Sequence, residues 1–345
     1  MTVINGIDLA GLGSMVEEVA YPDEVPGRTV HIDADFLAYQ CSYEREGEDK
    51  SLEDMLHNVD VATEHLRRLA AAERAVMHLT PNGSNKGGRY EIALQKEYQG
   101  NRKDEEKKPR YLHVIREFMH KDRGALMHMD CEADDGMSIA QYRAIASGNA
   151  HLSIIASKDK DLGMVPGLHL EWDTGSIVNA DTFGSIWIDE RGKLRGWGQK
   201  FFWAQMLMGD TADNIQGLPK VPASVMNKIS PTKAVTAALE TLRDPSAGQT
   251  KREKAQATLL DRKPGACGPA TAFKILENLN DHRSAFSVVK ALYEQCSKIH
   301  TFLDYRTGKT VKWQDVFKSE AMLLWMRRDN DNNDVFNWMR EVCIA

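Results

Sequence analysis

The sequence predicts an α/β fold, with a central, mostly parallel sheet in the N-terminal half and a helical region after it. First, short apolar runs alternate with helical periodicities between residues 28 and 195, an order typical of parallel strands joined by right-handed crossovers. Second, from residue 201 onward helical patterns dominate. Third, acidic residues gather where predicted strands end, and this edge forms the ligand crevice of open α/β sheets.

The predicted elements follow one another in the order that such a fold requires. Residues 1–27 are mixed in pattern, end in a stretch with Pro22, Pro26 and Gly27, and are interpreted as an N-terminal extension. Short apolar runs predict strands at residues 28–33, 75–79, 125–129, 152–156, 168–172 and 186–188. Apolar residues three and four apart predict helices at residues 52–72, 111–120, 137–146, 201–208, 233–242, 270–279 and 284–296, with one more directly after Asp33 and two near the C-terminus.

The stretch from residue 129 to residue 166 carries the central acidic motifs. It contains Glu132, Asp134, Asp135, Asp159 and Asp161. Asp134 and Asp135 open a predicted helix, while Asp159 and Asp161 follow the carboxyl end of a predicted strand, so both groups can face one site. Carboxylates gathered so closely repel one another unless bound cations offset the repulsion. Acidic residues also cap helix starts and occur in solvated turns, so each motif alone leaves both interpretations open.

Three further motifs bear on the same question. Asp33 ends the first predicted strand, although taken alone it is as well explained as a helix cap. Asp210 and Asp213 are three residues apart and can project together from one turn, or simply mark a capped helix start. A Gly-containing loop precedes a later predicted helix, and the free N–H groups at such a helix start can bind phosphate. Taken alone, this loop is better explained as an ordinary turn before a core helix. Its candidate DNA contacts are Gly265, Gly268, Thr271 and Lys274.

Composition sets outer limits on these interpretations. The chain has 345 residues, 42% hydrophobic and 27% charged, which describes a folded globular protein of two domains or one enlarged one. We expect a cytoplasmic protein, because no basic and apolar leader or membrane-length segment is visible, and we expect its five dispersed cysteines to be reduced core thiols. A net charge of -6 counts weakly against nucleic acid, but carboxylates sequestered by metal would leave a less acidic surface, and basic residues cluster at residues 96–110.

Five motifs occur in a fixed order between residues 28 and 279: Val-His-Ile-Asp33, Glu-Tyr98-Gln-Gly-Asn-Arg102, Glu132-Ala-Asp134-Asp135, Ser-Lys-Asp159-Lys-Asp161 and Gly-Asp210-Thr-Ala-Asp213-Asn-Ile-Gln-Gly217. In content and order this set resembles the flap endonuclease superfamily, and most closely the phage 5′ to 3′ exonucleases and the 5′-nuclease domain of bacterial DNA polymerase I. The resemblance implies a PIN-like nuclease domain over residues 28–195, with a helical arch near residues 90–112. It also implies a helix-hairpin-helix type DNA-binding region over residues 196–300, interrupted by an insertion at 219–264, and then C-terminal helices over residues 301–345.

The resemblance also assigns roles to individual residues. One divalent cation would be held by Asp33, Glu132, Asp134 and Asp135, and a second by Asp159, Asp161, Asp210 and Asp213. Hard oxygen ligands suit Mg²⁺ or Mn²⁺. Arg102, assisted by Lys103, would stabilise charge on the phosphate, although both also fit a solvated basic run, and Arg89 and Tyr98 would contact DNA.

Three positions depart from the family pattern. Gln99 stands where the family usually has Lys, so that Lys96 or Lys103 would have to replace the amine. Asn82 stands where relatives commonly carry an acid. Residues 219–264 separate the Asp210 motif from the Gly-rich loop, and we expect this insertion to be helical and either to extend the grip on duplex DNA or to be merely solvated.

The leading functional hypothesis is a metal-dependent 5′ to 3′ exonuclease that acts on duplex DNA with 5′ ends and leaves 5′-phosphate products. The protein would act in phage replication or recombination, as a monomer in the host cytoplasm. Removal of flaps, or of RNA primers from RNA–DNA hybrids, would be a further activity. Any polymerase would be a separate chain. A non-cleaving module that binds branched DNA through a nuclease-like fold is the second hypothesis. A PIN-type ribonuclease is the third.

Overall fold

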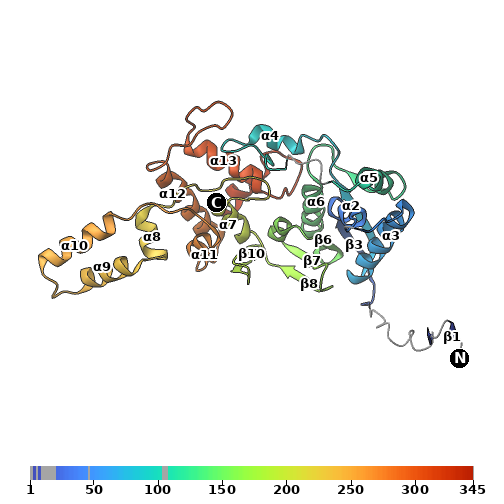
Figure 1. Cartoon of the computed structure of the whole chain (residues 1–345), viewed down its shortest axis with the longest axis horizontal. Coiled ribbons are helices and arrows are strands. Elements are labelled where there is room, and N and C mark those ends of the chain that lie inside the picture. Colours follow the sequence, from blue (N-terminus) through green and yellow to red (C-terminus); the bar gives the residue numbers. More distant parts are fainter. Residues whose placement is uncertain (1–2, 5–6, 9–20, 46, 103–107, 345) are drawn as a thin grey trace.

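The computed structural model, which describes residues 3–4, 7–8, 21–45, 47–102 and 108–344, is built on a six-stranded sheet (Figure 1). The strand order is β5-β4-β3-β6-β7-β8. These strands are β3 (Val25–Asp33), β4 (Ala72–Leu79), β5 (Leu126–Met127), β6 (Ser153–Ala156), β7 (Gly167–Leu170) and β8 (Ile177–Ala180). All neighbours pair in parallel except β7 and β8, which are antiparallel. The predicted α/β class with a mostly parallel sheet is therefore confirmed.

Some strands differ from the sequence-based expectation. Strand β3 begins at Val25, three residues earlier than expected, because Val25 already pairs with Ala72. The edge strand β8 was not expected. Outside the main sheet, the expected strand at residues 186–188 is β9 (Ser185–Ile188), which forms a hairpin with β10 (Leu194–Trp197), and β1 (Val3–Ile4) pairs with β2 (Ile7–Asp8).

Helices cover both faces of the sheet. One face packs on α2 (Ala34–Ser42), α3 (Leu52–Leu69) and α5 (Leu112–Lys121). The other packs on α6 (Ala133–Ala146). Side chains of β6 alternate between the two sides, since Ile154 belongs to the core of the first face and Ile155 to the core that contains Met137 of α6.

The second region is a helical bundle around α7 (Lys200–Met208), whose side chains are buried on nearly all sides. Around it lie α11 (Pro269–Leu276), α12 (His282–Cys296), α13 (Trp313–Leu324), α14 (Asp334–Met339) and the short π-helix η5 (Arg340–Ile344). At its centre Trp203 stacks on Trp338 with ring centroids 5.4 Å apart. The bundle shares one continuous apolar core with α6, so that the helical region is joined firmly to the sheet.

The expected insertion is helical. It consists of α8 (Ala223–Ile229), α9 (Lys233–Arg243) and α10 (Gln249–Leu260), which extend from the bundle on the side away from the sheet (Figure 1). In the region expected to form a helical arch, the structure shows the end of α4 (Arg89–Ile92) and then turns, while residues 103–107 lie outside the described part of the chain.

Shorter helical turns complete the chain: η1 (Lys86–Gly88), η3 (Ala150–Leu152) and η4 (Lys160–Met164). All five cysteines are buried and none is in a disulfide. None of the helices in the described ranges combines the length and the apolar character needed to cross a membrane.

Candidate functional site

A cavity of about 460 Å³ opens at the carboxyl edge of the sheet, where β3 and β6 end and α6 begins. Seven carboxylates line it: Asp33, Asp35, Glu132, Asp134, Asp159, Asp161 and Asp213. Six cationic side chains line it as well: Lys86, Arg89, Arg102, Lys158, Lys160 and Arg195. The strand-end and helix-start motifs therefore face one space, as the sequence predicted.

Three of these carboxylates, which we call the open group, have no cationic partner. Asp33 ends β3 and caps α2, accepting hydrogen bonds from the Phe36 N–H at 3.0 Å and the Ser157 hydroxyl at 2.8 Å. Asp159 caps η4 through the Asp161 N–H at 2.9 Å. Asp134 accepts no hydrogen bond from any described residue. Among the residues that the structure describes, no Lys or Arg lies within ion-pair distance of these three side chains.

Burial and mutual repulsion raise the pKa values of two carboxyl groups in the open group. Burial, followed by the charges of Asp33 and Asp159, raises the pKa of Asp134 well above its ordinary value. Burial also raises the pKa of Asp33 to about 6. These carboxylates thus repel one another, and no Lys or Arg of the described residues forms an ion pair with any of them.

The neighbouring carboxylates, which we call the lysine-paired group, are balanced differently. The Lys160 ammonium contacts Asp161 at 2.8 Å and also contacts Asp210. The Gln205 amide donates to Asp161 at 2.6 Å and to Asp210 at 3.3 Å. Although burial alone would raise it, the Lys160 charge lowers the pKa of Asp210 below its ordinary value. Burial, followed by the charge of Asp159, nevertheless raises the pKa of Asp161 well above its ordinary value. In this half of the site a lysine already supplies positive charge, but it balances Asp210 more fully than Asp161.

A tight loop presents Asp210 and Asp213. Asp210 and Ile215 exchange two backbone hydrogen bonds of 2.7 and 2.9 Å, which closes the loop. Gly209 precedes it with φ +71°, and a Cβ there would lie 2.3 Å from the Ile215 carbonyl oxygen, so only glycine fits. Asn214 within the loop adopts φ +57°, a conformation that costs a non-glycine residue about 1 kcal/mol.

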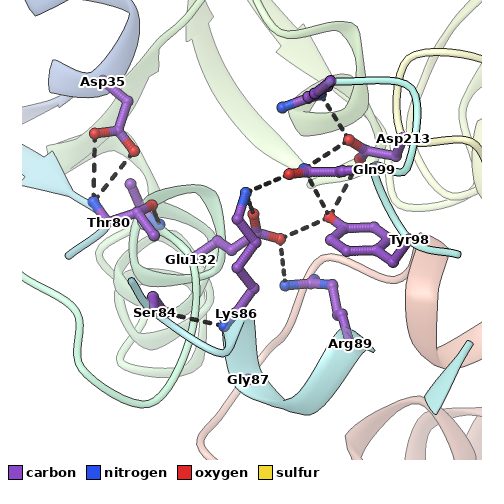
Figure 2. A network of polar contacts seen from close by, with 12 residues as sticks. Asp35, Thr80, Ser84, Lys86, Gly87, Arg89, Tyr98, Gln99, Glu132 and Asp213 are labelled. Atoms are coloured by element: carbon purple, nitrogen blue, oxygen red, sulfur yellow. Dashed lines mark hydrogen bonds and ion pairs between the residues drawn. The ribbon is translucent and has the colours of Figure 1, made fainter. Parts of the chain in front are cut away.

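A polar network around Tyr98 joins Glu132 to Asp213 (Figure 2). The Tyr98 hydroxyl donates to Glu132 at 2.8 Å and lies 3.3 Å from Asp213. The Lys86 ammonium contacts Glu132 at 3.0 Å and Gln99 Oε1 at 2.5 Å. The Gln99 amide in turn donates to Asp213 at 2.8 Å. Glu132 and Asp213 are therefore fixed by neutral and cationic donors together.

The base of the expected arch is anchored to the same loop. The Gln99 N–H donates to the Asp213 carbonyl at 2.9 Å, and Gln99 has φ +52°. Arg102 donates to the Asp213 carboxylate at 2.6 Å, and its side chain is 52% exposed, so part of the guanidinium faces solvent. Burial nevertheless raises the pKa of Asp213.

Asp135, although adjacent to Asp134, faces the protein interior. The Arg89 guanidinium grips it with two hydrogen bonds of 2.7 and 3.0 Å, and its carboxylate also accepts the N–H groups of Glu132 and Arg327. Both Asp135 and Arg89 are almost fully buried. Burial alone would raise its pKa, but the Arg89 charge holds the pKa of Asp135 below its ordinary value. Asp135 is thus part of an internal ion pair that supports the start of α6.

The donor chemistry of the cavity fits a divalent cation. Hard carboxylate oxygens suit Mg²⁺ or Mn²⁺, and the unpartnered Asp134 stands where positive charge would be most stabilising. In the described part of the chain, however, no group of three or more His, Cys, Asp or Glu side chains is arranged so that it could hold a metal ion directly. Ions such as Mg²⁺ usually retain several waters and need few direct protein ligands.

Other predicted positions lie away from the cavity lining. Asn82 and Lys96 are exposed, and neither lines the cavity. Lys103 lies outside the described residues. Gly265 pairs with Val221, whereas Gly268 caps α11, which carries the half-buried Thr271 and the exposed Lys274. These last residues start a different helix in the bundle.

Three lysines of the described residues line the cavity, Lys86, Lys158 and Lys160, and none of them was predicted from the sequence. Lys86 lies in a Gly-rich turn and adopts φ +53°. This segment has no helix or strand periodicity from which a role for Lys86 could be predicted. Lys160 stands between Asp159 and Asp161, so its proximity to the acidic motif was visible in the sequence. Its contact with Asp210, fifty residues later in the chain, was not.

No known family model matches the sequence, and no curated protein does. Solved structures of bacteriophage T5 proteins show a distant likeness. The T5 protein crystallised with metal ions has 13% identity and a TM-score of 0.41, with 79% of this chain and 99% of that chain covered. A variant of the T5 flap endonuclease with DNA and metal ions has 14% identity and a TM-score of 0.42, with 79% and 98% covered. The T5 5′-exonuclease with zinc has 14% identity and a TM-score of 0.39, with 79% and 99% covered.

These matched proteins are 5′ nucleases of the kind that the five motifs resemble. At this degree of likeness, a functional conclusion for this chain depends on its own site residues.

Proposed function

We propose that this protein is a metal-dependent 5′ nuclease, a 5′ to 3′ exonuclease that hydrolyses phosphodiesters in duplex DNA and leaves 5′-phosphate products. The observation that carries this proposal is the cavity itself, in which carboxylates from separate motifs converge, no Lys or Arg of the described residues pairs with Asp134, and the charges of Asp33 and Asp159 raise its pKa. RNA primers paired with DNA would be further substrates. The protein would act in the cytoplasm during phage replication or recombination, as a monomer beside a separate polymerase.

The open group of Asp33, Asp134 and Asp159 would hold one Mg²⁺ or Mn²⁺ ion. Asp161 and Asp210 would hold a second one, with Lys160 displaced from between them, and Glu132 and Asp213 would flank both positions. Asp135 is left out of this set because Arg89 occupies both of its oxygens. When bound, such ions supply an activated water and neutralise charge on the phosphate.

The protein's own cations would receive the phosphate. Arg102 and Lys86 both line the cavity, and each is positioned by a carboxylate, Asp213 and Glu132 respectively. Charge that develops on the phosphate oxygens is stabilised by such preorganised donors. Lys86 also supplies an ammonium beside Gln99, which stands at the position where the family pattern usually has a lysine.

The deciding experiment is a time course on duplex DNA labelled at the 5′ end of one strand and the 3′ end of the other, with Mg²⁺ and with chelator. Release of mononucleotides or short oligomers from the 5′ label first, only with metal, is expected. Release from the 3′ label first would contradict the proposed polarity, and cleavage in chelator would contradict metal dependence.

Arg102→Ala should lower turnover by about a hundredfold or more, since removal of one preorganised donor to the reacting group costs that much in other hydrolases. The protein should remain folded, because the Arg102 side chain is half exposed. Arg195→Ala, which removes another cation from the cavity wall, is the matched control and should have a smaller effect. Turnover within twofold of the unaltered protein would remove Arg102 from the catalytic group.

A non-cleaving module that binds branched DNA is the second candidate. It is favoured by Lys160, whose ammonium occupies the space between Asp161 and Asp210 that a second cation would need. Tight binding of the labelled duplex without product in Mg²⁺ or Mn²⁺ would establish this alternative.

A further inference from the structure

The segment of residues 222–264, which we call the arm, is a self-contained outgrowth of the helical bundle. Its two ends meet where Val221 and Gly265 exchange backbone hydrogen bonds of 2.8 and 3.0 Å. Within it, α9 packs along α10, and Val235, Ala238 and Ala255 form a small buried contact. Figure 1 shows the arm extending away from the sheet.

The arm has the opposite charge to the rest of the protein. It contains eight Lys or Arg and four Asp or Glu, a formal charge of +4. Because the whole chain has a charge of -6, the remaining residues carry -10. Such a separation of charge raises the local attraction for anions well above what the net charge implies.

Most of the arm's basic side chains are not used to hold the arm together. Arg252 and Arg262 are, because they donate to backbone carbonyls, among them that of Ser230 at 2.6 Å from Arg262. The other six are exposed and have neither an ion pair nor a side-chain hydrogen bond with any described residue: Lys228, Lys233, Arg243, Lys251, Lys254 and Lys263. Their charge is available to a partner.

The remaining composition of the arm indicates which partner fits. Residues 222–264 contain no Phe, Tyr, Trp or His, although aromatic anchors are the side chains that usually dominate protein–protein interfaces. They are rich in Ala, Thr and Lys, a surface suited to contacts with phosphates rather than bases or apolar pockets. The base of the arm lies beside α11 and its Gly268 cap.

We propose that the arm binds the phosphate backbone of duplex DNA, independently of sequence, at a distance from the cavity. This inference rests on the proposed function only for the identity of the DNA. Helices α9 and α10 have 11 and 12 residues, so the arm extends the protein by about 16–18 Å at about 1.5 Å per residue. That length corresponds to roughly five base pairs of duplex, at about 3.4 Å per base pair.

The first test removes the arm. Residues 222–264 are replaced by Asn-Gly, a dipeptide suited to a two-residue turn between the paired Val221 and Gly265. Affinity is measured in chelator for duplexes of about 10 and about 30 base pairs, so that cleavage does not interfere and charge contacts can be counted. The long duplex should bind roughly tenfold or more weakly to the deletion variant at about 0.1 M salt, while the short duplex binds nearly as before.

The second test keeps the arm folded and removes charge. In one variant Lys228, Lys233, Lys251 and Lys254 are changed to Gln; the control changes four exposed lysines outside the arm, Lys298, Lys309, Lys312 and Lys318. Each phosphate that a variant no longer neutralises should reduce the slope of log affinity against log salt by about 0.9, so the slope should fall by up to roughly 3–4 in the arm variant and by little in the control.

The proposal would be overturned if the two lysine variants had equal slopes, or if the deletion variant bound the long duplex with unchanged affinity. The arm would then be a candidate site for an acidic protein partner instead. Because binding in chelator does not depend on hydrolysis, a reduced slope in the arm variant would support the arm's role even if the nuclease assay failed.

Discussion

The open group and the lysine-paired group, which lie next to each other at the acidic cavity, differ in how the charge of their carboxylates is balanced. In the lysine-paired group, Lys160 stands between Asp161 and Asp210 and neutralises part of their charge. In the open group, Asp33, Asp134 and Asp159 face one another without a cation, and the pKa values of Asp33 and Asp134 rise. Burial and the charge of Asp159 also raise the pKa of Asp161, so the repulsion extends from the open group to its neighbour, and within the lysine-paired group only the pKa of Asp210 is lowered. A protein retains such repulsion where a ligand of opposite charge relieves it.

The largest effects should separate Asp134 from its neighbour Asp135. Asp134→Asn should reduce cleavage by about a thousandfold or more, while in chelator it should unfold at the same or a higher temperature, because a repelled charge is removed. Asp135→Asn should instead destabilise the protein by about 3–5 kcal/mol, since the buried Arg89 then loses its bidentate partner and keeps only its pair with Glu132. Thermal unfolding in chelator and the labelled-duplex assay measure both. A destabilised Asp134→Asn variant would mean that repulsion in the open group is negligible.

The next largest effect should come from Lys160. Lys160→Ala leaves Asp161 and Asp210 without their cation, and a loss of about 3 kcal/mol in chelator is expected. Addition of Mn²⁺ should restore more stability in this variant than in the unaltered protein, because the lysine no longer competes. The control is Lys158→Ala, whose half-exposed pair with Asp173 is worth at most about 1 kcal/mol. Equal losses in the two variants, measured by urea unfolding, would contradict the balancing role of Lys160.

Glu320 of α13 is a buried carboxyl group outside the open group, so it tests how far burial, without repulsion inside that group, raises a pKa. It is 1% exposed and, among the described residues, accepts hydrogen bonds from the Gln95 amide at 2.8 Å and the Gly217 N–H at 2.9 Å. Burial raises its pKa to about 7. A raised folded pKa gives stability that is present below the unfolded pKa of about 4.3 and is lost as pH rises toward 7. Glu320→Gln does not titrate, so relative to the unaltered protein it should gain about 2 kcal/mol between pH 5 and pH 7 in chelator.

Urea unfolding of Glu320→Gln and the unaltered protein at several pH values provides the measurement. A difference in unfolding free energy that stays constant with pH would show that Glu320 is charged in the folded protein at pH 5. In that case burial alone would not account for the raised pKa values in the open group either.

The sequence was sufficient to predict which edge of the sheet carries the site. Strand ends and a helix start are local patterns, and parallel strands bring their carboxyl ends to one edge, so Asp33, Asp134 and Asp159 could be placed together from these patterns alone. Asp135 shows the limit of this reasoning. Successive residues of a helix point about 100° apart, so one of two adjacent aspartates faces the cavity while the other meets Arg89, and nothing local says which.

Features that depend on distant partners were beyond the sequence. Lys86 reaches Glu132 from a turn 46 residues earlier, and its left-handed backbone conformation belongs to no regular pattern. Strand β8 has two exposed residues among four and pairs only with β7, so its short sequence lacks the continuous apolar run of a buried strand. The arm was expected as a helical insertion, but its closure by Val221 and Gly265 is a tertiary contact.

The smallest effect should come from Tyr98, which connects the two sides of the cavity. Its hydroxyl donates to Glu132 at 2.8 Å, and burial raises the pKa of Tyr98 well above its ordinary value, so the hydroxyl stays protonated as a donor. Tyr98→Phe should cost about 1 kcal/mol of stability and lower turnover by less than about tenfold, because Lys86 and Arg89 still hold Glu132. Tyr90→Phe, at the exposed ring that packs edge-on against Tyr98, is the matched control and should change neither quantity. A thousandfold loss of turnover in Tyr98→Phe would place the hydroxyl itself among the groups that contact the reacting phosphate.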